Sequence, residues 1–162
     1  MPRELTIERV VPGGSGLGRL DGAVTLVAGG LPGDRVVVEP RPDGPRLLRA
    51  EILSVESPGP HRRPDAEVCP RALDASCGGC DWAALRLESH RELKVELVRD
   101  ALRRIGRVPD AELPDFGFVP SPRNYRLRSR LHWDGDGKLG FLARASSETS
   151  DLVSCEVVSE SL

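Results

Sequence analysis

Short apolar runs alternate with turn-forming residues through residues 4–56. Each run is rich in β-branched residues and is bounded by glycine- and proline-containing turns, a pattern that is typical of short β-strands. Several such strands predict a small barrel or sandwich, and about fifty residues suit a five-stranded barrel of the oligonucleotide-binding type. The runs are LTIERVV (5–11), AVTLVAG (23–29), DRVVVEP (34–40) and RLLRAEILSVE (46–56).

A helical period replaces this alternation further along the chain. Six apolar residues recur three and four positions apart, which predicts an amphipathic helix. Ser89 is a candidate N-cap, Glu92 would complete a capping box with it, and Gly106 supplies a C-terminal stop. The apolar residues are Leu93, Leu97, Val98, Ala101, Leu102 and Ile105.

The last third of the chain has the pattern of a β-hairpin. The stretch NYRLRSRLHW (124–133) leads into the turn DGDG (134–137), and KLGFLA (138–143) follows. A short final strand is expected at 151–154, directly before Cys155. The predicted fold class is therefore α+β, mainly β with one long helix.

A proline-rich stretch, SPGPHRRPD (57–65), separates the strand-rich segment from the rest of the chain. We expect a β-barrel domain over residues 1–58 and a small α+β region over residues 59–162. The total length of 162 residues is sufficient for two small domains of this kind.

Composition and charge restrict the class of protein. The chain is 39% hydrophobic and 30% charged, which is typical of soluble globular proteins. No apolar run approaches the ~20 residues that cross a bilayer, and the start MPRELTIERVV lacks the apolar core of a secretory signal. We therefore expect no membrane partner and a cytoplasmic location. The net charge of −2 argues against a protein that coats nucleic acid non-specifically.

The cysteine spacing is the strongest chemical signal in the sequence. Three cysteines lie in the loop CPRALDASCGGC (69–80), and the fourth stands far from them. Because a reducing cytosol disfavours disulfides, four thiols favour a metal centre. Three clustered thiolates with one remote cysteine are a ligand set of iron–sulfur clusters, and the two loop glycines let bare backbone approach the cluster. The four candidate ligands are Cys69, Cys77, Cys80 and Cys155.

Two other interpretations of these cysteines stay open. A structural zinc site is the main competitor, although all-cysteine zinc sites often have two C-x2-C knuckles and this chain has one. A redox pair formed by Cys77 and Cys80 is the other, but such a pair normally opens a helix after a strand. It would also leave the remaining two cysteines unexplained.

The segment before the hairpin turn is rich in arginine. From Pro120 to Trp133 it carries four arginines and no acidic residue. If the segment is a strand, alternate arginines share one face, and a phosphate backbone would relieve their mutual repulsion. The neighbouring tyrosine could stack on an unpaired base, and the alternative is a solvated strand face. The candidate RNA-binding residues are Arg123, Tyr125, Arg126, Arg128 and Arg130.

Aromatic and histidine residues outside that segment receive no role in binding. In a chain with 4% aromatic residues we expect the large rings to pack in the core, namely Trp82, Trp133 and Phe141. The histidines show no metal-ligand spacing, and no chemistry is assigned to His61, His90 or His132.

Four motifs occur in a fixed order along the chain. They are GGSGLGRLDGAVTLVAGGLPGDRVVVE (13–39), CGGC (77–80), NYRLRSRL (124–131) and LGFLARASSETSDLVSC (139–155). The ordered set resembles the N-terminal half of the SAM-dependent RNA (uracil-5)-methyltransferases of the 23S rRNA type. In that resemblance the first motif corresponds to a TRAM domain, an RNA-binding β-barrel. The second motif corresponds to the loop that holds a 4Fe–4S cluster.

The resemblance implies the 4Fe–4S cofactor, ligated by the four cysteines, and ribosomal RNA as partner. One departure is that seven residues separate Cys69 from Cys77 where the family pattern has five. The other is that nothing in these 162 residues resembles the family's catalytic domain. We therefore assign no catalytic residue and expect SAM only through a catalytic domain or chain outside this sequence.

Three functional hypotheses follow. The first is an RNA-binding, iron–sulfur-containing N-terminal module of a ribosomal-RNA uracil-5 methyltransferase that is not catalytic alone. The second is a free-standing TRAM-type RNA-binding protein with a structural zinc or iron–sulfur site. The third is a redox enzyme that uses Cys77 and Cys80.

Overall fold

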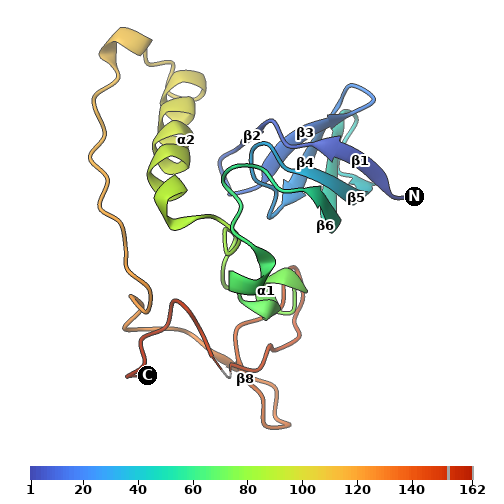
Figure 1. The fold of residues 1–162 in the computed structure, drawn as a ribbon, viewed down its shortest axis with the longest axis vertical. Helices are drawn as coiled ribbons and strands as arrows, with labels where there is room; N and C mark the ends of the chain where they lie inside the picture. Colours follow the sequence, from blue (N-terminus) through green and yellow to red (C-terminus); the bar gives the residue numbers. More distant parts are fainter. Residues whose placement is uncertain (153, 162) are drawn as a thin grey trace. The chain divides into compact units, whose positions relative to one another are not determined.

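Six strands within residues 3–57 form one curled sheet in the computed structural model, which describes residues 1–152 and 154–161 (Figure 1). The strand order across the sheet is β1-β5-β6-β4-β3-β2, with only the β4–β6 pair parallel. The strands are β1 (Arg3–Thr6), β2 (Arg9–Val10), β3 (Gly16–Leu20), β4 (Ala23–Ala28), β5 (Arg35–Pro42) and β6 (Leu47–Ser57).

The core of the sheet follows from the alternation in the sequence. In β5 every second residue points inward, and the side chains of Val36 and Val38 are completely buried. Residues from neighbouring strands complete one apolar cluster, which also explains why β-branched side chains are favoured here. The cluster consists of Leu5, Ile7, Leu20, Val27, Val36, Val38 and Ala50.

Two glycines of β3 permit the sheet to curl tightly. A Cβ atom on Gly18 would lie 2.6 Å from the carbonyl oxygen of Thr6, and one on Gly16 would lie 2.6 Å from the carbonyl oxygen of Gly30. No side chain fits at either position. The close approach lets the Glu8 N–H donate to the Leu17 carbonyl at 2.8 Å, which joins the segment between β1 and β2 to β3.

The sheet has six strands where five were predicted. The run LTIERVV divides into β1 and β2, and β3 (Gly16–Leu20) lies outside the four predicted runs. Ile7 leaves the strand ladder at the point of division. Its N–H donates to the Asp34 carbonyl at 2.8 Å, and its own carbonyl accepts from the Gly33 N–H at 2.9 Å. A tertiary contact with the turn before β5 therefore divides what the sequence pattern presents as a single strand.

A buried ion pair fixes that turn to the segment that leaves the sheet. The Asp34 side chain is completely buried and the Arg62 side chain is 5% exposed, with 2.7 Å between the Arg62 Nη2 and Asp34 Oδ2 atoms. The Asp34 carboxylate also accepts from the N–H groups of Leu31 and Gly59, each at 2.8 Å. The Arg62 Nη2 atom donates to the Gly29 carbonyl at 2.8 Å. Both buried charges thus have several hydrogen-bond partners, as burial requires.

The predicted helix is present as α2 (His90–Arg104), preceded by a 3-10 turn at Leu87–Ser89. The predicted capping box is wrong. Ser89 has helical backbone angles and makes no side-chain cap, because its hydroxyl lies 3.1 Å from the His61 Nδ1 atom instead. A partner distant in the sequence has therefore replaced the local cap.

The chain forms two compact units, and α2 belongs to the same unit as the sheet. The sheet unit comprises Met1–Arg63 and Leu85–Phe118. An ion pair of 3.3 Å between Arg9 and Asp100 joins strand and helix. The sequence-based boundary at residue 58 instead assigned the helix to the cysteine region. After a short 3-10 turn at Asp110–Glu112, the chain returns along α2, where Lys94 and Arg99 lie over the rings of Phe118 and Phe116.

The second unit, here called the cysteine unit, comprises Pro64–Ala84 and Val119–Leu162. It has little regular structure. Its elements are a 3-10 turn at Asp65–Glu67, α1 (Pro70–Leu73), β7 (His132–Trp133) and β8 (Leu139–Gly140).

The predicted hairpin is present, but it is much shorter than expected. Its two strands contain two residues each, and residues 124–131 form no strand. Residues 151, 152 and 154 are not in a strand either, and residue 153 of the predicted final strand lies outside the described residues.

No helix in the described ranges is both long and apolar enough to cross a membrane.

The buried ion pair predicts a large loss of stability in Arg62→Ala. The substitution leaves the Asp34 carboxylate buried without its cation, so the free energy of unfolding should fall by about 3–5 kcal/mol. Urea unfolding followed by the circular dichroism of α2, the long helix of the sheet unit, measures it. Arg49→Ala is the matched control, because its pair with Asp43 is exposed and should contribute at most about 1 kcal/mol. Equal losses in the two variants would contradict the assigned role of the buried pair.

Candidate functional site

The loop that carries three cysteines is folded back on itself. Cys69 precedes α1, and Pro70 occupies the first helical position, where it needs no N–H partner. After this single helical turn the N–H of Cys77 donates to the Arg71 carbonyl at 2.9 Å. The Ser76 N–H donates to the Asp74 carboxylate at 2.9 Å and closes a turn. A hydrogen bond from the Ser76 side chain is the main cause that lowers the pKa of the Asp74 carboxyl, and the bond from the Ser76 backbone is the next. The seven residues between the first two cysteines therefore form a turn of helix and a tight loop.

The chain after β8 packs against this loop. The N–H of Gly78 donates to the Leu142 carbonyl at 2.8 Å, and the backbone N–H of Arg144 donates to the Ala75 carbonyl at 3.4 Å. The Arg144 guanidinium pairs with Asp81 at 3.0 Å and reaches the Cys80 carbonyl at 3.4 Å. The CGGC segment is thus held on one side by the residues that follow the hairpin.

Gly79 makes a tight contact where the loop meets the hairpin segment. A Cβ atom at this position would lie 3.2 Å from the Phe141 Cδ2 atom and 3.4 Å from the Cys77 sulfur. The N–H of Gly79 points at the same sulfur, with 3.4 Å between nitrogen and sulfur. The backbone of a loop glycine therefore approaches a cysteine sulfur, as predicted from the sequence.

All four cysteines are free, partly exposed thiols, and their charges interact at Cys80. Burial is the main cause that raises the pKa of the Cys80 thiol, and the charge of Cys155 is the next. The charges of Cys77 and Cys69 raise this pKa further, whereas the Arg126 guanidinium lowers it. The remote cysteine therefore lies within electrostatic reach of the loop, although 75 positions separate Cys80 from Cys155 (155 − 80).

Arg126 belongs to this cysteine environment. Its backbone pairs with the segment after Cys155, because its N–H donates to the Val157 carbonyl at 2.8 Å and its carbonyl accepts from Ser159 at 2.9 Å. Its guanidinium lies 5.7 Å from the ring centroid of Tyr125 and 6.0 Å from that of Phe141. A hydrogen bond to the Tyr125 hydroxyl is the main cause that raises the pKa of Arg126, and the charges of Cys80 and Cys155 add to it.

These features fit thiolate ligation, although the described residues contain no group of three or more His, Cys, Asp or Glu side chains with the geometry of a formed metal site. The charges of the other three cysteines raise the pKa of the Cys80 thiol, a backbone N–H meets the Cys77 sulfur, and the Arg126 guanidinium lowers the pKa of Cys80. Those are the donor set and surroundings that a thiolate-bound metal centre needs.

The arginine segment has a different geometry from the one predicted. Residues 124–131 are not a strand, so the expected separation of arginine and leucine faces is wrong: Leu127 is 72% exposed. Three arginines remain exposed, and within the described ranges none of them forms an ion pair. They are Arg123, Arg128 and Arg130.

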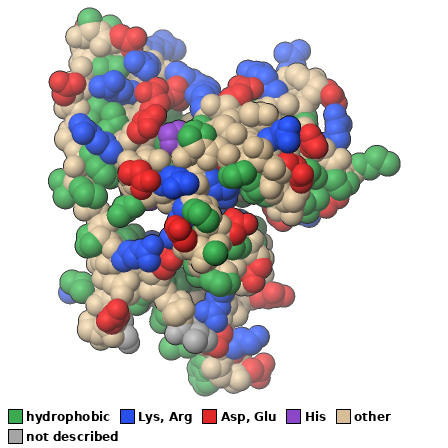
Figure 2. Space-filling model, viewed as in Figure 1, with side chains coloured by type: hydrophobic (Ala, Val, Ile, Leu, Met, Phe, Trp, Pro, Cys, Tyr) green, Lys and Arg blue, Asp and Glu red, His purple; other side chains and the backbone are tan. Residues whose placement is uncertain are grey.

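Acidic and basic side chains are interspersed elsewhere on the visible surface, as Figure 2 shows. Exposed ion pairs account for much of this pattern, including Arg3 with Asp21 and Arg49 with Asp43. Three exposed arginines of the sheet unit, Arg35, Arg41 and Arg46, likewise form no ion pair in the described residues. The arginines of the cysteine unit differ from them because they lie within one segment, 123–130, that contains no acidic residue.

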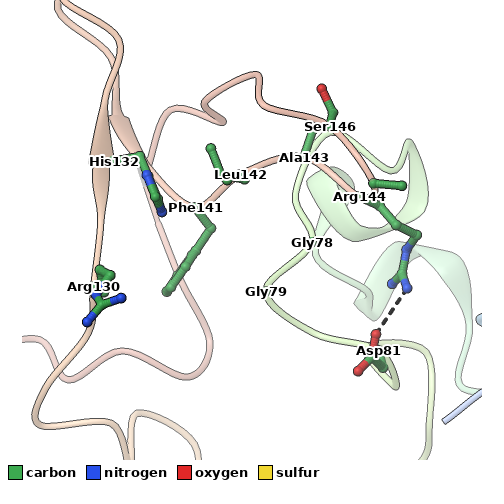
Figure 3. A pocket seen from close by; sticks show the side chains of 11 residues that line it. Gly78, Gly79, Asp81, Arg130, His132, Phe141, Leu142, Ala143, Arg144 and Ser146 are labelled. Atoms are coloured by element: carbon green, nitrogen blue, oxygen red, sulfur yellow. Dashed lines mark hydrogen bonds and ion pairs between the residues drawn. The ribbon is translucent and has the colours of Figure 1, made fainter. Parts of the chain in front are cut away.

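A hollow of about 410 Å³ lies between the loop and the hairpin inside the cysteine unit. Figure 3 shows Arg130 and His132 on one side, the backbone of Gly78 and Gly79 on the other, and the Phe141 ring between them. Sequence reasoning did not find this site, because no spacing marks its residues. It also expected Phe141 and Trp133 in the core, whereas Phe141 lines the hollow and Trp133 is 70% exposed.

The relatives found by comparison with known proteins are RNA methyltransferases. No family model matches the chain. An uncharacterized RNA methyltransferase of Corynebacterium efficiens is 35% identical over 156 residues, which is 95% of this chain and 36% of that protein. A similar protein of Bdellovibrio bacteriovorus is 31% identical, over 98% of this chain and 39% of its own length. The 23S rRNA (uracil(1939)-C(5))-methyltransferase RlmD of Halomonas elongata is 35% identical, over 96% of this chain and 32% of its own. The chain thus spans about a third of the length of these relatives.

The tight contact at Gly79 predicts a local loss of stability in Gly79→Ala. The added methyl group meets Phe141 and the Cys77 sulfur, so unfolding of the cysteine unit should become easier by about 1–3 kcal/mol. Tryptophan fluorescence reports on this unit alone, because both tryptophans of the chain, Trp82 and Trp133, lie in it. Gly117→Ala is the control, since a Cβ atom there meets nothing within 4 Å; it lies in the sheet unit, so its unfolding is followed by the circular dichroism of α2 and should be unchanged. An unaltered fluorescence transition in Gly79→Ala would refute the packing argument.

Proposed function

We propose that this chain, a homologue of the N-terminal part of RNA methyltransferases that include 23S rRNA uracil-C5 methyltransferases, is the RNA-binding, iron–sulfur-containing module of such an enzyme. The observation that carries the proposal is the set of three exposed arginines in the same unit as the four interacting thiols. No ion pair to these arginines occurs among the described residues. Unneutralised guanidinium groups favour a phosphate-bearing partner.

Cys69, Cys77, Cys80 and Cys155 would hold the metal centre in this proposal. A 4Fe–4S cluster bound by four thiolates would supply a covalent cross-link between the loop and the segment around Cys155. Such a link stabilises a unit whose regular elements contain few residues, because metal binding and folding are coupled. Arg126 would offset the negative charge of the thiolates rather than contact RNA directly. Zinc in the same ligand set is the alternative metal.

The proposed RNA-binding residues would make two kinds of contact, with phosphates and with a base. Arg123, Arg128 and Arg130 would contact phosphates, because they are exposed and lack acidic partners in the described residues. Tyr125 is 45% exposed, and its ring would stack on an unpaired base while Arg126 supports it from one side.

Methyl transfer itself is assigned to no residue of this sequence. In the proposed enzyme, SAM and the target uridine would be bound by a catalytic domain or partner chain, and this module would hold the ribosomal RNA. A cytoplasmic location accompanies the proposal, because ribosomal RNA is the partner.

The metal assignment predicts iron that depends on Cys155. Anaerobically purified protein should contain about four irons per chain with matching acid-labile sulfide and a broad visible absorption. Cys155→Ser removes the remote ligand and should lower the iron content strongly, whereas the neighbouring Ser154→Ala should retain it. An iron content in Cys155→Ser equal to that of the wild-type protein would exclude this cysteine as a ligand. Stoichiometric zinc without sulfide would establish the zinc alternative.

The RNA assignment predicts a change in the salt dependence of binding. The triple variant Arg123→Gln, Arg128→Gln, Arg130→Gln should bind ribosomal RNA fragments more weakly, with a salt slope reduced by up to about 0.7 per lost contact. A fluorescence anisotropy titration at several salt concentrations measures both quantities.

A variant of the sheet unit controls for net charge. Arg35→Gln, Arg41→Gln, Arg46→Gln removes three exposed arginines that form no ion pair in the part of the chain described. It should reduce the slope less than the first triple variant. A slope reduced equally by both would show that total charge, and not the arginine segment, determines binding.

A further inference from the structure

The hollow between loop and hairpin is lined by basic side chains on one side and by glycine backbone on the other. Arg130 and His132 provide the charged wall, and both side chains are exposed at its edge (Figure 3). The opposite wall is the backbone of Gly78 and Gly79, where no side chain obstructs the space. Its volume of about 410 Å³ lies within the range of about 300–1,000 Å³ that small-ligand pockets occupy.

The balance of charge in the hollow favours an anion. Asp81 is the acidic residue that lines it, and the Arg144 guanidinium neutralises that carboxylate at 3.0 Å. Arg130 forms no ion pair within the described residues and therefore adds a positive charge without a counter-ion. The His132 imidazole adds a further N–H donor beside it.

The remaining lining residues favour a ligand with a planar, apolar part. The Phe141 ring stands between the two walls, against the glycine backbone. The hydroxyl of Ser146 accepts from the Glu148 N–H at 3.0 Å and keeps its own hydrogen available for donation. An anion-binding edge next to an aromatic ring matches a nucleotide, because phosphate and base then meet different walls.

We propose that the hollow binds one unpaired nucleotide of the RNA, with its phosphate at Arg130 and His132 and its base against Phe141. The inference deepens the proposed function and rests on it, since it assigns the position where single-stranded RNA is held. It also gives His132 and Phe141 a binding role that their sequence positions did not indicate. Because the other wall is the CGGC loop, the nucleotide lies directly against the segment that carries Cys77 and Cys80.

Two neighbouring arginines provide a matched test. Arg128 and Arg130 are both exposed and free of ion pairs in the described chain, but only Arg130 lines the hollow. With the whole anaerobically purified chain and a short fluorescein-labelled oligouridine, Arg130→Gln should weaken binding about tenfold. Arg128→Gln should weaken it less. Equal effects of the two substitutions would overturn the assignment of the phosphate to this hollow.

The base contact is tested separately with Phe141→Leu, which keeps an apolar side chain in the packing against Gly79. It should weaken binding of oligouridine several-fold and leave binding of an abasic oligomer with the same phosphates unchanged. Circular dichroism and tryptophan fluorescence verify that the variant is folded. If both oligomers lose affinity equally, the ring supports the structure and does not contact a base.

A crosslinking experiment identifies the site directly and separates the two proposals. Oligouridine containing 4-thiouridine should crosslink to the peptide that contains His132 and Phe141, and Arg130→Gln should reduce the yield. Wild-type protein that binds no RNA would refute the proposed function. Wild-type protein that binds RNA but crosslinks only in the sheet unit would refute this inference alone. Competition by free uridine monophosphate at similar affinity would show that the hollow serves a free nucleotide.

Discussion

The pairing of Asp34 with Arg62 is the contact on which the sheet unit depends. It holds the turn before β5, the segment after β6 and the carbonyl of Gly29 together in one buried network. A buried network of this kind is stable when its polar atoms have hydrogen-bond partners, and the Asp34 carboxylate has several. The same turn also accepts and donates the hydrogen bonds that divide β1 from β2. One ion pair thus fixes where the chain leaves the sheet.

The cysteine unit is organised by different forces. Its strands contain two residues each, and it exposes large apolar side chains such as Leu127 and Trp133. Backbone hydrogen bonds between the loop and the residues after β8 supply part of its order, and contacts with Arg126 and Arg144 supply another part. A unit with so little buried apolar surface gains much from a cross-link at its centre, which is the structural role proposed for the metal.

The candidate site combines features that are close in space and distant in sequence. Arg126 joins the cysteine environment because its backbone pairs with residues 157 and 159. Arg130 lines the hollow instead, although only four positions separate the two residues. An irregular backbone permits neighbouring arginines to serve different purposes, whereas a regular strand would have placed them on a single face.

Local patterns in the sequence were sufficient for several features. The alternation of apolar residues located the strands of the sheet other than β3, and the helical period located α2. Such features depend on neighbours along the chain, and periodicity therefore reveals them. The four-cysteine metal site stays a prediction from spacing.

Only the tertiary structure decided the division of β1 from β2, the loss of the Ser89 cap and the grouping of α2 with the sheet. It also decided the absence of a strand at 124–131 and the existence of the hollow. Three of these features depend on a partner far away in the sequence: Asp34 for Ile7, His61 for Ser89, and the glycine loop for Phe141. A periodic pattern carries no information about such partners, because it records only which face of an element is apolar.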